Sequence, residues 1–365
     1  MSEKRSYDAV IIGGGVIGLS CAWRAAQQGA NVAVIEKAQP PAGATRVSAG
    51  MLAPIGELTF GEPELLRMTL DSRALYADFV AELETATGFS TGYRHQGALH
   101  AALDRDEAAE LRRIHELQRS LGLEAEWLTP RRCRELESGL SPSCSGGVYA
   151  EGEACLDPRA LAQVLLTALA GAGVDVRTGV EVSEAVFDGE RLAGVRLEGG
   201  DELAAANVVL AAGAWSGQAE WLPEHARPPV RPVKGQIVEL RAPDGVAPCE
   251  RIIGAERVYL VPRADGRMIA GATVEEQGFD TTVTAGAVHE ILREAYRLLP
   301  DVAEMEMIEA AVGLRPGTPD NLPLIGPSGL KGLIWATGHF RNGVLLAPLT
   351  ADAVAELLSR GELPE

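Results

Sequence analysis

Cysteine is scarce and scattered in this chain of 365 residues. The five cysteines are Cys21, Cys133, Cys144, Cys155 and Cys249, and they form no C-x-x-C pair and stand beside no histidine cluster. This pattern predicts neither a disulfide framework nor a metal site, and it suits a reducing cytoplasm. No cysteine follows Cys249, which limits how a cofactor can be attached to the last third of the chain.

Long apolar runs are also missing. No stretch approaches the roughly 18–20 uninterrupted apolar residues that a membrane-spanning helix needs. Lys4 and Arg5 precede an apolar run over residues 9–23 that resembles a signal peptide, but glycines interrupt it and no small-x-small cleavage site follows. We therefore expect a cytoplasmic protein that has no membrane partner.

Positive charge is in deficit. Lys and Arg number 33 against 51 Asp and Glu, so the net charge is −18. A surface of this sign repels nucleic-acid phosphates and anionic lipids, and neither is an expected partner. The content of 46% hydrophobic and 23% charged residues is typical of a globular enzyme. The length predicts about two domains.

The first 36 residues follow the pattern of a βαβ unit. Residues 7–12 predict a buried strand, residues 16–28 a helix that ends at Gly29, and residues 31–36 a second strand. The turn between the first strand and the helix has the sequence Gly13-Gly14-Gly15-Val16-Ile17-Gly18, which matches G-x-G-x-x-G. This order of strand, glycine turn and helix makes the motif a specific sign of dinucleotide binding.

Each glycine of the motif has a physical task. Gly13 permits the tight turn, Gly15 lets the backbone approach a pyrophosphate at the helix N-terminus, and Gly18 allows close packing of helix and strand. Glu36 ends the second strand at about the 20-residue distance where a carboxylate binds ribose hydroxyls. A carboxylate there disfavours NADP, but the motif does not distinguish FAD from NAD.

Two further stretches favour FAD. Residues 43–51 are small and carry hydroxyls, so a ligand can approach their backbone, although an ordinary surface loop has the same composition. Residues 338–343 link a buried strand at 332–337 to a helix expected from about Val344. A helix N-terminus at this point would stabilise the negative charge that the pyrimidine edge of a flavin gains on reduction.

The remaining pattern places strands in two groups. Helical spacing covers residues 62–88, 105–121 and 158–172, whereas residues 236–272 contain short strands joined by an Asp-Gly turn, which is typical of an antiparallel sheet. We predict an α/β (α+β) fold, with a Rossmann-like FAD-binding domain and an inserted substrate domain on an antiparallel or mixed sheet. The predicted limits are 1–85, 150–218 and 313–365 for the former, and 86–149 and 219–312 for the latter.

These motifs occur together in a known family. The chain resembles the glycine oxidase and D-amino-acid oxidase family of flavoproteins, and most closely the glycine oxidases of bacterial thiazole biosynthesis. The resemblance covers nearly the whole chain in the family's order. The matching stretches are Ser48-Ala49-Gly50-Met51-Leu52, Pro232-Val233-Lys234-Gly235-Gln236, Tyr259-Leu260-Val261-Pro262-Arg263, Gly271-Ala272-Thr273, Gly313-Leu314-Arg315-Pro316-Gly317-Thr318 and Gly338-His339-Phe340-Arg341-Asn342-Gly343.

The resemblance implies a set of cofactor contacts beyond the glycine motif. They are Lys37, Ala44, Thr45, Ala49, Gly50, Met51, Val182, His339, Phe340, Arg341, Asn342, Gly343, Val344 and Leu345. Related sarcosine oxidases hold their flavin on a cysteine in the C-terminal third. Since this chain has no cysteine there, we expect FAD without a covalent link.

The substrate residues are predicted from the need to anchor a carboxylate. Hydride transfer from an aligned amino acid to a flavin requires no strong side-chain base, so we propose no acid or base residue. Arg315 lies between turn-prone Gly and Pro residues and is assigned the anchoring role by the resemblance. Tyr259 offers a second contact or a plain place in a sheet, and Arg341 contacts substrate, cofactor or only its own loop.

Three functions remain open from the sequence. The first is an oxidase that uses molecular oxygen to oxidise glycine, sarcosine or small D-amino acids, releasing ammonia and hydrogen peroxide in thiamine (thiazole) biosynthesis. The second is a dehydrogenase that passes electrons to a quinone or another acceptor, and the third is a flavoprotein without turnover. The sequence ranks neither the substrates, proline included, nor the oligomeric states, a homo-oligomer among them.

Overall fold

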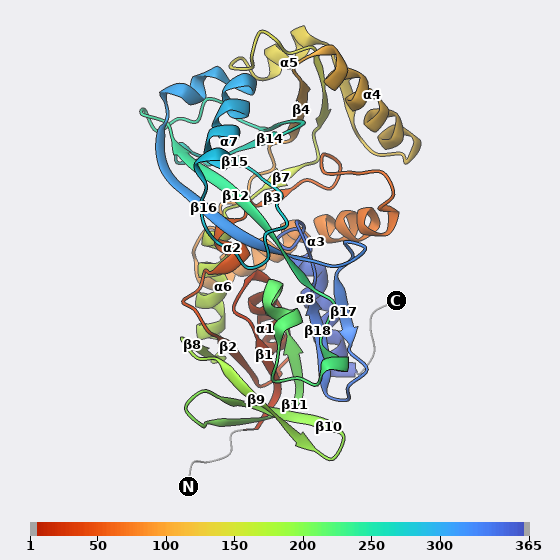
Figure 1. The fold of residues 1–365 in the computed structure, drawn as a ribbon, viewed down its shortest axis with the longest axis vertical. Coiled ribbons are helices and arrows are strands. Elements are labelled where there is room, and N and C mark those ends of the chain that lie inside the picture. The colour runs from red at the N-terminus through yellow and green to blue at the C-terminus, as the bar shows by residue number, and fades with distance from the viewer. Residues whose placement is uncertain (1–5, 361–365) are drawn as a thin grey trace.

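The computed structural model describes residues 6–360 and contains two large sheets (Figure 1). The first sheet has the order β17-β18-β11-β1-β2-β8, with β10 and β9 added through β11. Its strands are β1 (Ser6–Ile12), β2 (Val32–Glu36), β8 (Asp175–Thr178), β9 (Val182–Asp188), β10 (Arg191–Leu197), β11 (Glu202–Leu210), β17 (Leu324–Pro327) and β18 (Leu333–Thr337). The central pairs β18·β11, β11·β1, β1·β2 and β2·β8 are parallel, as expected for a nucleotide-binding sheet.

The second sheet has the order β16-β12-β15-β14-β13-β4-β6-β5 and is mostly antiparallel. Its strands are β4 (Ala98–Ala102), β5 (Glu126–Leu128), β6 (Gly146–Ala150), β12 (Arg231–Arg241), β13 (Ile252–Ala255), β14 (Val258–Pro262), β15 (Arg267–Gly271) and β16 (Glu306–Gly317). Only β13·β4 is parallel among these pairs. A small ribbon of β3 (Met51–Leu52) and β7 (Ala154–Cys155) lies between the large sheets (Figure 1). The predicted fold class is confirmed.

Eight helices cover the sheets in the described part of the chain. They are α1 (Val16–Gln27), α2 (Gly43–Val47), α3 (Pro63–Thr87), α4 (Arg105–Ser120), α5 (Pro130–Leu136), α6 (Pro158–Gly171), α7 (Ala285–Leu298) and α8 (Ala347–Arg360). Most of the predicted helices are present, and they carry the expected signals: Gly29 and Gly88 follow α1 and α3 with positive φ, and Asp157 caps α6 through the N–H of Arg159. None of these helices has the length and apolar character needed to cross a membrane.

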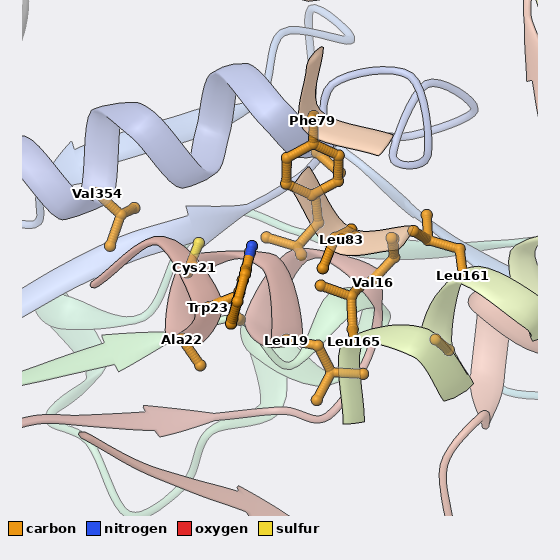
Figure 2. Close-up of a cluster of buried hydrophobic side chains, with 14 of the residues drawn as sticks. Val16, Leu19, Cys21, Ala22, Trp23, Phe79, Leu83, Leu161, Leu165 and Val354 are labelled. Carbon is orange, nitrogen blue, oxygen red and sulfur yellow. The ribbon is translucent and has the colours of Figure 1, made fainter. Parts of the chain in front are cut away.

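The main core surrounds α1, which is buried on most of its surface (Figure 2). Phe79 and Leu83 of α3 pack on it, and so do Leu161 and Leu165 of α6 (Figure 2). This continuous contact fixes α1 at the carboxyl end of β1. Cys21 is fully buried in the same cluster.

One local expectation was wrong, and one stretch has a structure that the sequence left open. The helix expected from about Val344 begins at Ala347, because residues 343–346 form turns whose Leu346 N–H bonds to the Asn342 carbonyl. The stretch 43–51, considered as a loop, begins with the short helix α2. Both differences concern backbone that faces the space between the two sheets, where tertiary contacts outweigh local propensity.

Ion pairs join the two sheets. Glu239 of β12 is 2% exposed and binds Arg159 of α6 at 3.0 Å and Arg267 of β15 at 3.2 Å. Asp157, the cap of α6, also binds Arg267, at 2.8 Å. A buried carboxylate held by two guanidinium groups is costly to break, so this junction fixes the position of one sheet on the other. The exact domain limits stay a prediction, and β16 runs through the expected limit at residue 313 while belonging wholly to the second sheet.

Candidate functional site

A cavity of about 940 Å³ lies between the two sheets. Its one wall is formed where the parallel strands β1, β2, β11 and β18 end, since Ile12, Glu36, Leu210 and Thr337 all line it. The opposite wall belongs to β12, β14, β15 and β16 of the second sheet. Ligands of open parallel sheets bind outside the carboxyl ends of the strands, and the volume is near the upper end of the range for ligand pockets.

The glycine turn has the geometry that its sequence predicts. A Cβ on Gly18 would stand 1.9 Å from the Gly13 carbonyl oxygen, so helix and turn touch directly. Gly13 has φ +117°, and a Cβ on it would stand only 2.3 Å from the Ala211 carbonyl oxygen. Gly15, by contrast, faces the cavity, and its nearest neighbour to an added Cβ is the Thr45 hydroxyl at 3.3 Å.

Free backbone donors point to an anion at this turn. Gly15 is the N-cap of α1 without a side-chain cap, and Val16 N–H donates to Thr45 at 3.0 Å. Within residues 6–360 no hydrogen bond uses the N–H of Gly15 or Ile17. The residues present therefore fit the pyrophosphate of a dinucleotide, whose charge the helix N-terminus would stabilise.

Glu36 stands at the predicted end of β2 and lines the cavity. Its carboxylate accepts the Gly14 N–H at 2.6 Å and the Ala38 N–H at 2.8 Å. Both bonds hold the carboxylate beside the glycine turn and leave acceptor capacity for hydroxyl groups. Lys37 places its ammonium 4.8 Å from the centre of the Trp215 ring at the same end of the cavity.

Most of the predicted cofactor residues reach the cavity. Gly13, Gly15, Val16, Ile17, Glu36, Lys37, Ala44, Thr45, Ala49, Gly50, Met51, Val182, His339, Phe340, Arg341, Gly343 and Val344 line it. Gly18, Asn342 and Leu345 are not among the lining residues of the described chain. Gly18 serves packing, Asn342 closes the turn to His339, and Leu345 is 1% exposed in the main core. Whether each lining residue touches a cofactor stays a prediction.

The loop after β18 is held tightly. His339 is 2% exposed and shares a 2.9 Å hydrogen bond with the Thr350 hydroxyl of α8. Burial lowers the pKa of His339 to about 3, so the imidazole stays neutral and acts through packing. Phe340 has φ +45°, an unusual value for a residue with a side chain, and its N–H donates to the Pro316 carbonyl at 2.9 Å. The loop is thereby tied to β16.

Arg315 and Tyr259 lie in the wall that the second sheet forms, opposite the parallel sheet that carries Glu36. The part of the cavity beside these two side chains is called the substrate end, and the part beside the glycine turn the nucleotide end. Arg315 donates to the Thr273 carbonyl at 3.0 Å, and within the described chain its Nε and second terminal nitrogen have no protein partner. Tyr259 lines the same end, and burial raises the pKa of its phenol to about 12. The hydroxyl therefore keeps its proton and can donate to an anion beside the guanidinium.

Two glycines make room for these side chains. A Cβ on Gly235 of β12 would lie 2.3 Å from the Arg315 guanidinium nitrogen, and a Cβ on Gly271 of β15 would lie 2.6 Å from the Tyr259 hydroxyl. Each side chain lies flat on the backbone of the neighbouring strand, since β16 pairs with β12 and β14 pairs with β15. The second sheet thus provides a fixed support for both groups.

Arg341 differs from Arg315 in its partners. Its guanidinium binds Glu62 at 3.2 Å and the Glu57 carbonyl at 3.2 Å, so it ties the loop after β18 to the segment before α3. It lines the cavity, and a direct contact with substrate stays a prediction.

Several cavity residues carry no local sequence signal. Trp215 and Trp221 follow β11, and only the pairing of β11 with β1 brings them to the cavity. Glu57 and His100 reach the substrate end from a loop and from β4. The sequence alone missed all four, although the end of a buried strand at Leu210 is a signal that points to Trp215.

Comparisons with known proteins show the family to which the chain belongs. A family model described as FAD dependent oxidoreductase matches residues 8–357. The glycine oxidase of Geobacillus kaustophilus (strain HTA426) is 35% identical, covering 98% of this chain and 94% of the relative. A crystal structure of glycine oxidase from Geobacillus kaustophilus superposes with a TM-score of 0.89 at 35% identity, over 98% of this chain and 95% of that one.

A second kind of relative is longer. The bifunctional protein ThiO/ThiG of Trichormus variabilis (strain ATCC 29413 / PCC 7937) is 37% identical over 96% of this chain, which spans only 52% of that relative. The chain thus spans about half the length of the curated relative it matches here.

Proposed function

Because this chain belongs to the family of FAD-dependent oxidoreductases, we propose that it is an FAD-dependent oxidase of glycine and other small amines such as sarcosine and small D-amino acids. The family's cofactor, FAD, fits the cavity by the free donors at Gly15 and the carboxylate of Glu36. The similarity to glycine oxidases over nearly the whole chain supports the substrate class.

The observation that carries the proposal is Arg315 beside Tyr259. A guanidinium with unused donors and a protonated phenol form a carboxylate site at the substrate end of the cavity. Two parallel bonds from Arg to a carboxylate fix the orientation of a small amino acid. Orientation of the α-carbon is the main contribution that the protein has to make.

FAD held at the glycine turn and Glu36 would supply the acceptor for a hydride from the α-carbon, and oxygen would take up the two electrons as hydrogen peroxide. The substrate is left as an imine, which water hydrolyses to a 2-oxo acid and ammonia. Arg315 and Tyr259 hold the carboxylate during this step, and the apolar wall of Met51 and Ile237 excludes water from one side.

Anaerobic mixing with a panel of amino acids tests the proposal. Glycine or a small N-methyl or D-amino acid should bleach the flavin absorbance, and admission of oxygen should restore it with formation of peroxide. Oxygen uptake at background together with turnover by an artificial acceptor would favour the dehydrogenase. No bleaching with any amino acid would leave a flavoprotein without turnover.

We further propose that FAD is bound without a covalent link. No cysteine of the described chain lines the cavity. Acid precipitation should release all the flavin as FAD, and colour on the denatured pellet would contradict the proposal.

A place in thiamine (thiazole) biosynthesis follows from the resemblance. The relative named ThiO/ThiG supports it. The chain should restore growth without thiamine to a bacterium that lacks its own glycine oxidase, while the Arg315→Ala variant should not. Growth of neither strain would argue against this role.

A further inference from the structure

Three ionisable side chains collect beside the substrate end of the cavity. Glu57 and His100 line the cavity, and Glu153, which is 0% exposed, lies directly behind them. The backbone of Gly56 separates these groups, because a Cβ there would stand 2.5 Å from His100 Nε2 and 2.9 Å from Glu153 Oε2. Nothing in the carboxylate site described above uses these three groups.

Glu153 fixes the segment that carries Glu57. One oxygen of its carboxyl group accepts the N–H groups of Ile55 and Gly56, both at 2.7 Å. Its other oxygen is buried without a hydrogen-bond partner in the described chain. Burial raises the pKa of Glu153 to about 8, and the nearby charge of Glu57 adds to this rise. Glu153 is therefore mostly protonated at neutral pH, and its role is to hold the loop.

His100 is also uncharged. Burial lowers the pKa of its imidazole to about 4. With Glu153 and His100 neutral and Tyr259 protonated, Glu57 is the group of this cluster that can carry a negative charge. Burial raises the pKa of Glu57 overall, whereas the positive charges of Arg341 and Arg315 lower it and favour the carboxylate.

The charges are thus arranged as a pair. Arg315 and Tyr259 present donors to one end of a small amino acid, and Glu57 lines the same cavity close enough for its charge to interact with both of them. A zwitterion has a carboxylate and an ammonium group on one carbon, so it needs both signs within one small site. The arginine that lies nearest to the Glu57 segment, Arg341, is already bound by Glu62 and by the Glu57 carbonyl.

We propose that Glu57 binds the ammonium group of the substrate and accepts one of its protons. In this step an N–H bond of the ammonium breaks, its electron pair stays on nitrogen, and an O–H bond forms on the Glu57 carboxylate. The neutral amine that results is the form from which a hydride can leave the α-carbon. The inference rests on the proposed oxidation of amino acids, to which it adds the amine-side residue.

The raised pKa of Glu57 suits this task. A proton acceptor works best when its pKa lies near the working pH, and burial moves a carboxyl group in that direction. Since the pKa is raised, the carboxylate is available above it and is lost as the pH falls through it.

The first test separates ammonium binding from carboxylate binding. Anaerobic rapid mixing gives the Kd of glycine, and displacement of a bound flavin-perturbing carboxylate gives the Kd of glycolate, which has a hydroxyl in place of the ammonium. Glu57→Gln should raise the Kd of glycine about 10-fold or more, as expected for loss of a charge-assisted bond. The Kd of glycolate should stay within about 3-fold of the wild-type value. An equal rise in both Kd values, or no rise in either, would overturn the proposal.

The second test follows the proton. Wild-type kcat/KM should remain high below the pKa of free glycine ammonium, because Glu57 removes the proton after binding. In Glu57→Gln only free amine reacts, so kcat/KM should fall about tenfold per pH unit in that range, to about 10²-fold below wild type near neutral pH. Parallel pH profiles for the two proteins would overturn the proposal.

Two further variants complete the design. Glu57→Asp should recover part of the lost efficiency, which a merely structural role would not predict. Glu64→Gln, an exposed carboxylate on the first turn of α3, is the matched control and should behave as wild type. A wild-type enzyme that fails to reduce its flavin with any amino acid would overturn the proposed function itself, an outcome distinct from an active enzyme that is insensitive at Glu57.

Discussion

The two ends of the cavity are built by different means. At the nucleotide end, residues 13–36 supply a glycine turn, a helix N-terminus and a carboxylate within one βαβ unit. At the substrate end, Arg315, Tyr259 and Glu57 come from β16, β14 and a loop before α3, far apart along the chain. The first end offers mainly backbone groups to a ligand, and the second offers side chains.

Glycine shows the same contrast. In the turn after β1, Gly13 and Gly18 allow backbone to touch backbone. In the second sheet, Gly235 and Gly271 allow the Arg315 and Tyr259 side chains to lie on a neighbouring strand. A local motif can therefore specify the nucleotide end, whereas the substrate end depends on the register of whole strands, such as Gly235 opposite Gly313 in β12·β16.

The contrast predicts that Gly18→Ala has the largest effect and destroys the nucleotide end. The new Cβ would overlap the Gly13 carbonyl oxygen, which would lie 1.9 Å away. Overpacking against backbone costs about 3 kcal/mol, which for a chain of this length corresponds to a fall in Tm of about 4 °C. Thermal unfolding measures the loss of stability, and titration with FAD measures the loss of cofactor binding. The control Gly171→Ala, at the end of α6 with open space around it, should be neutral or stabilising.

Arg315→Ala should impair the substrate end and leave the nucleotide end intact. Loss of a charge-assisted pair costs about 1.5–3 kcal/mol, or more in a dry site, so kcat/KM for glycine should fall about 10- to 150-fold with FAD still bound. Arg315→Lys should also be impaired, because an ammonium cannot form two parallel bonds. The control is an amine without a carboxylate, whose slow turnover should hardly change. Equal loss for both substrates would mean that Arg315 serves the flavin or the fold.

Glu36→Ala should affect only the nucleotide end. Removing a carboxylate that binds ribose hydroxyls costs roughly 1.5–3 kcal/mol, so FAD affinity should fall about 10- to 150-fold with substrate preference unchanged. The Gly14 N–H, which now bonds to Glu36 at 2.6 Å, would also lose its partner. Fluorescence titration of the apoprotein with FAD checks this. Unchanged affinity would place the ribose elsewhere.

The smallest effect is expected for Tyr259→Phe. The phenol gives one hydrogen bond to the carboxylate, worth about 0.5–1.5 kcal/mol, so kcat/KM should fall about 2- to 13-fold. Because burial raises the pKa of the phenol to about 12, the ratio of wild type to variant should stay constant with pH up to about 10. A ratio that changes near neutral pH would indicate a role in proton transfer.

The sequence by itself determined the βαβ unit at the nucleotide end and the class of the fold. The limits of β1, α1 and β2 were predicted within a residue or two, and so was the position of Glu36 at the end of β2. Hydrophobic period, glycine position and helix caps are local properties, so a sequence pattern can reveal them. The resemblance carried Arg315 and Tyr259, since their motifs remain readable without knowing the register of the sheet.

Only the tertiary structure decided where α8 begins, how Arg341 is bound, and which carboxylates line the cavity. The turns at residues 343–346, the binding of Arg341 by Glu62 and the position of Glu57 all depend on segments that meet through folding. Glu57 and His100 look like ordinary polar residues in the sequence. Their chemistry follows from burial and neighbouring charge, and these are properties of the packed molecule that no local pattern contains.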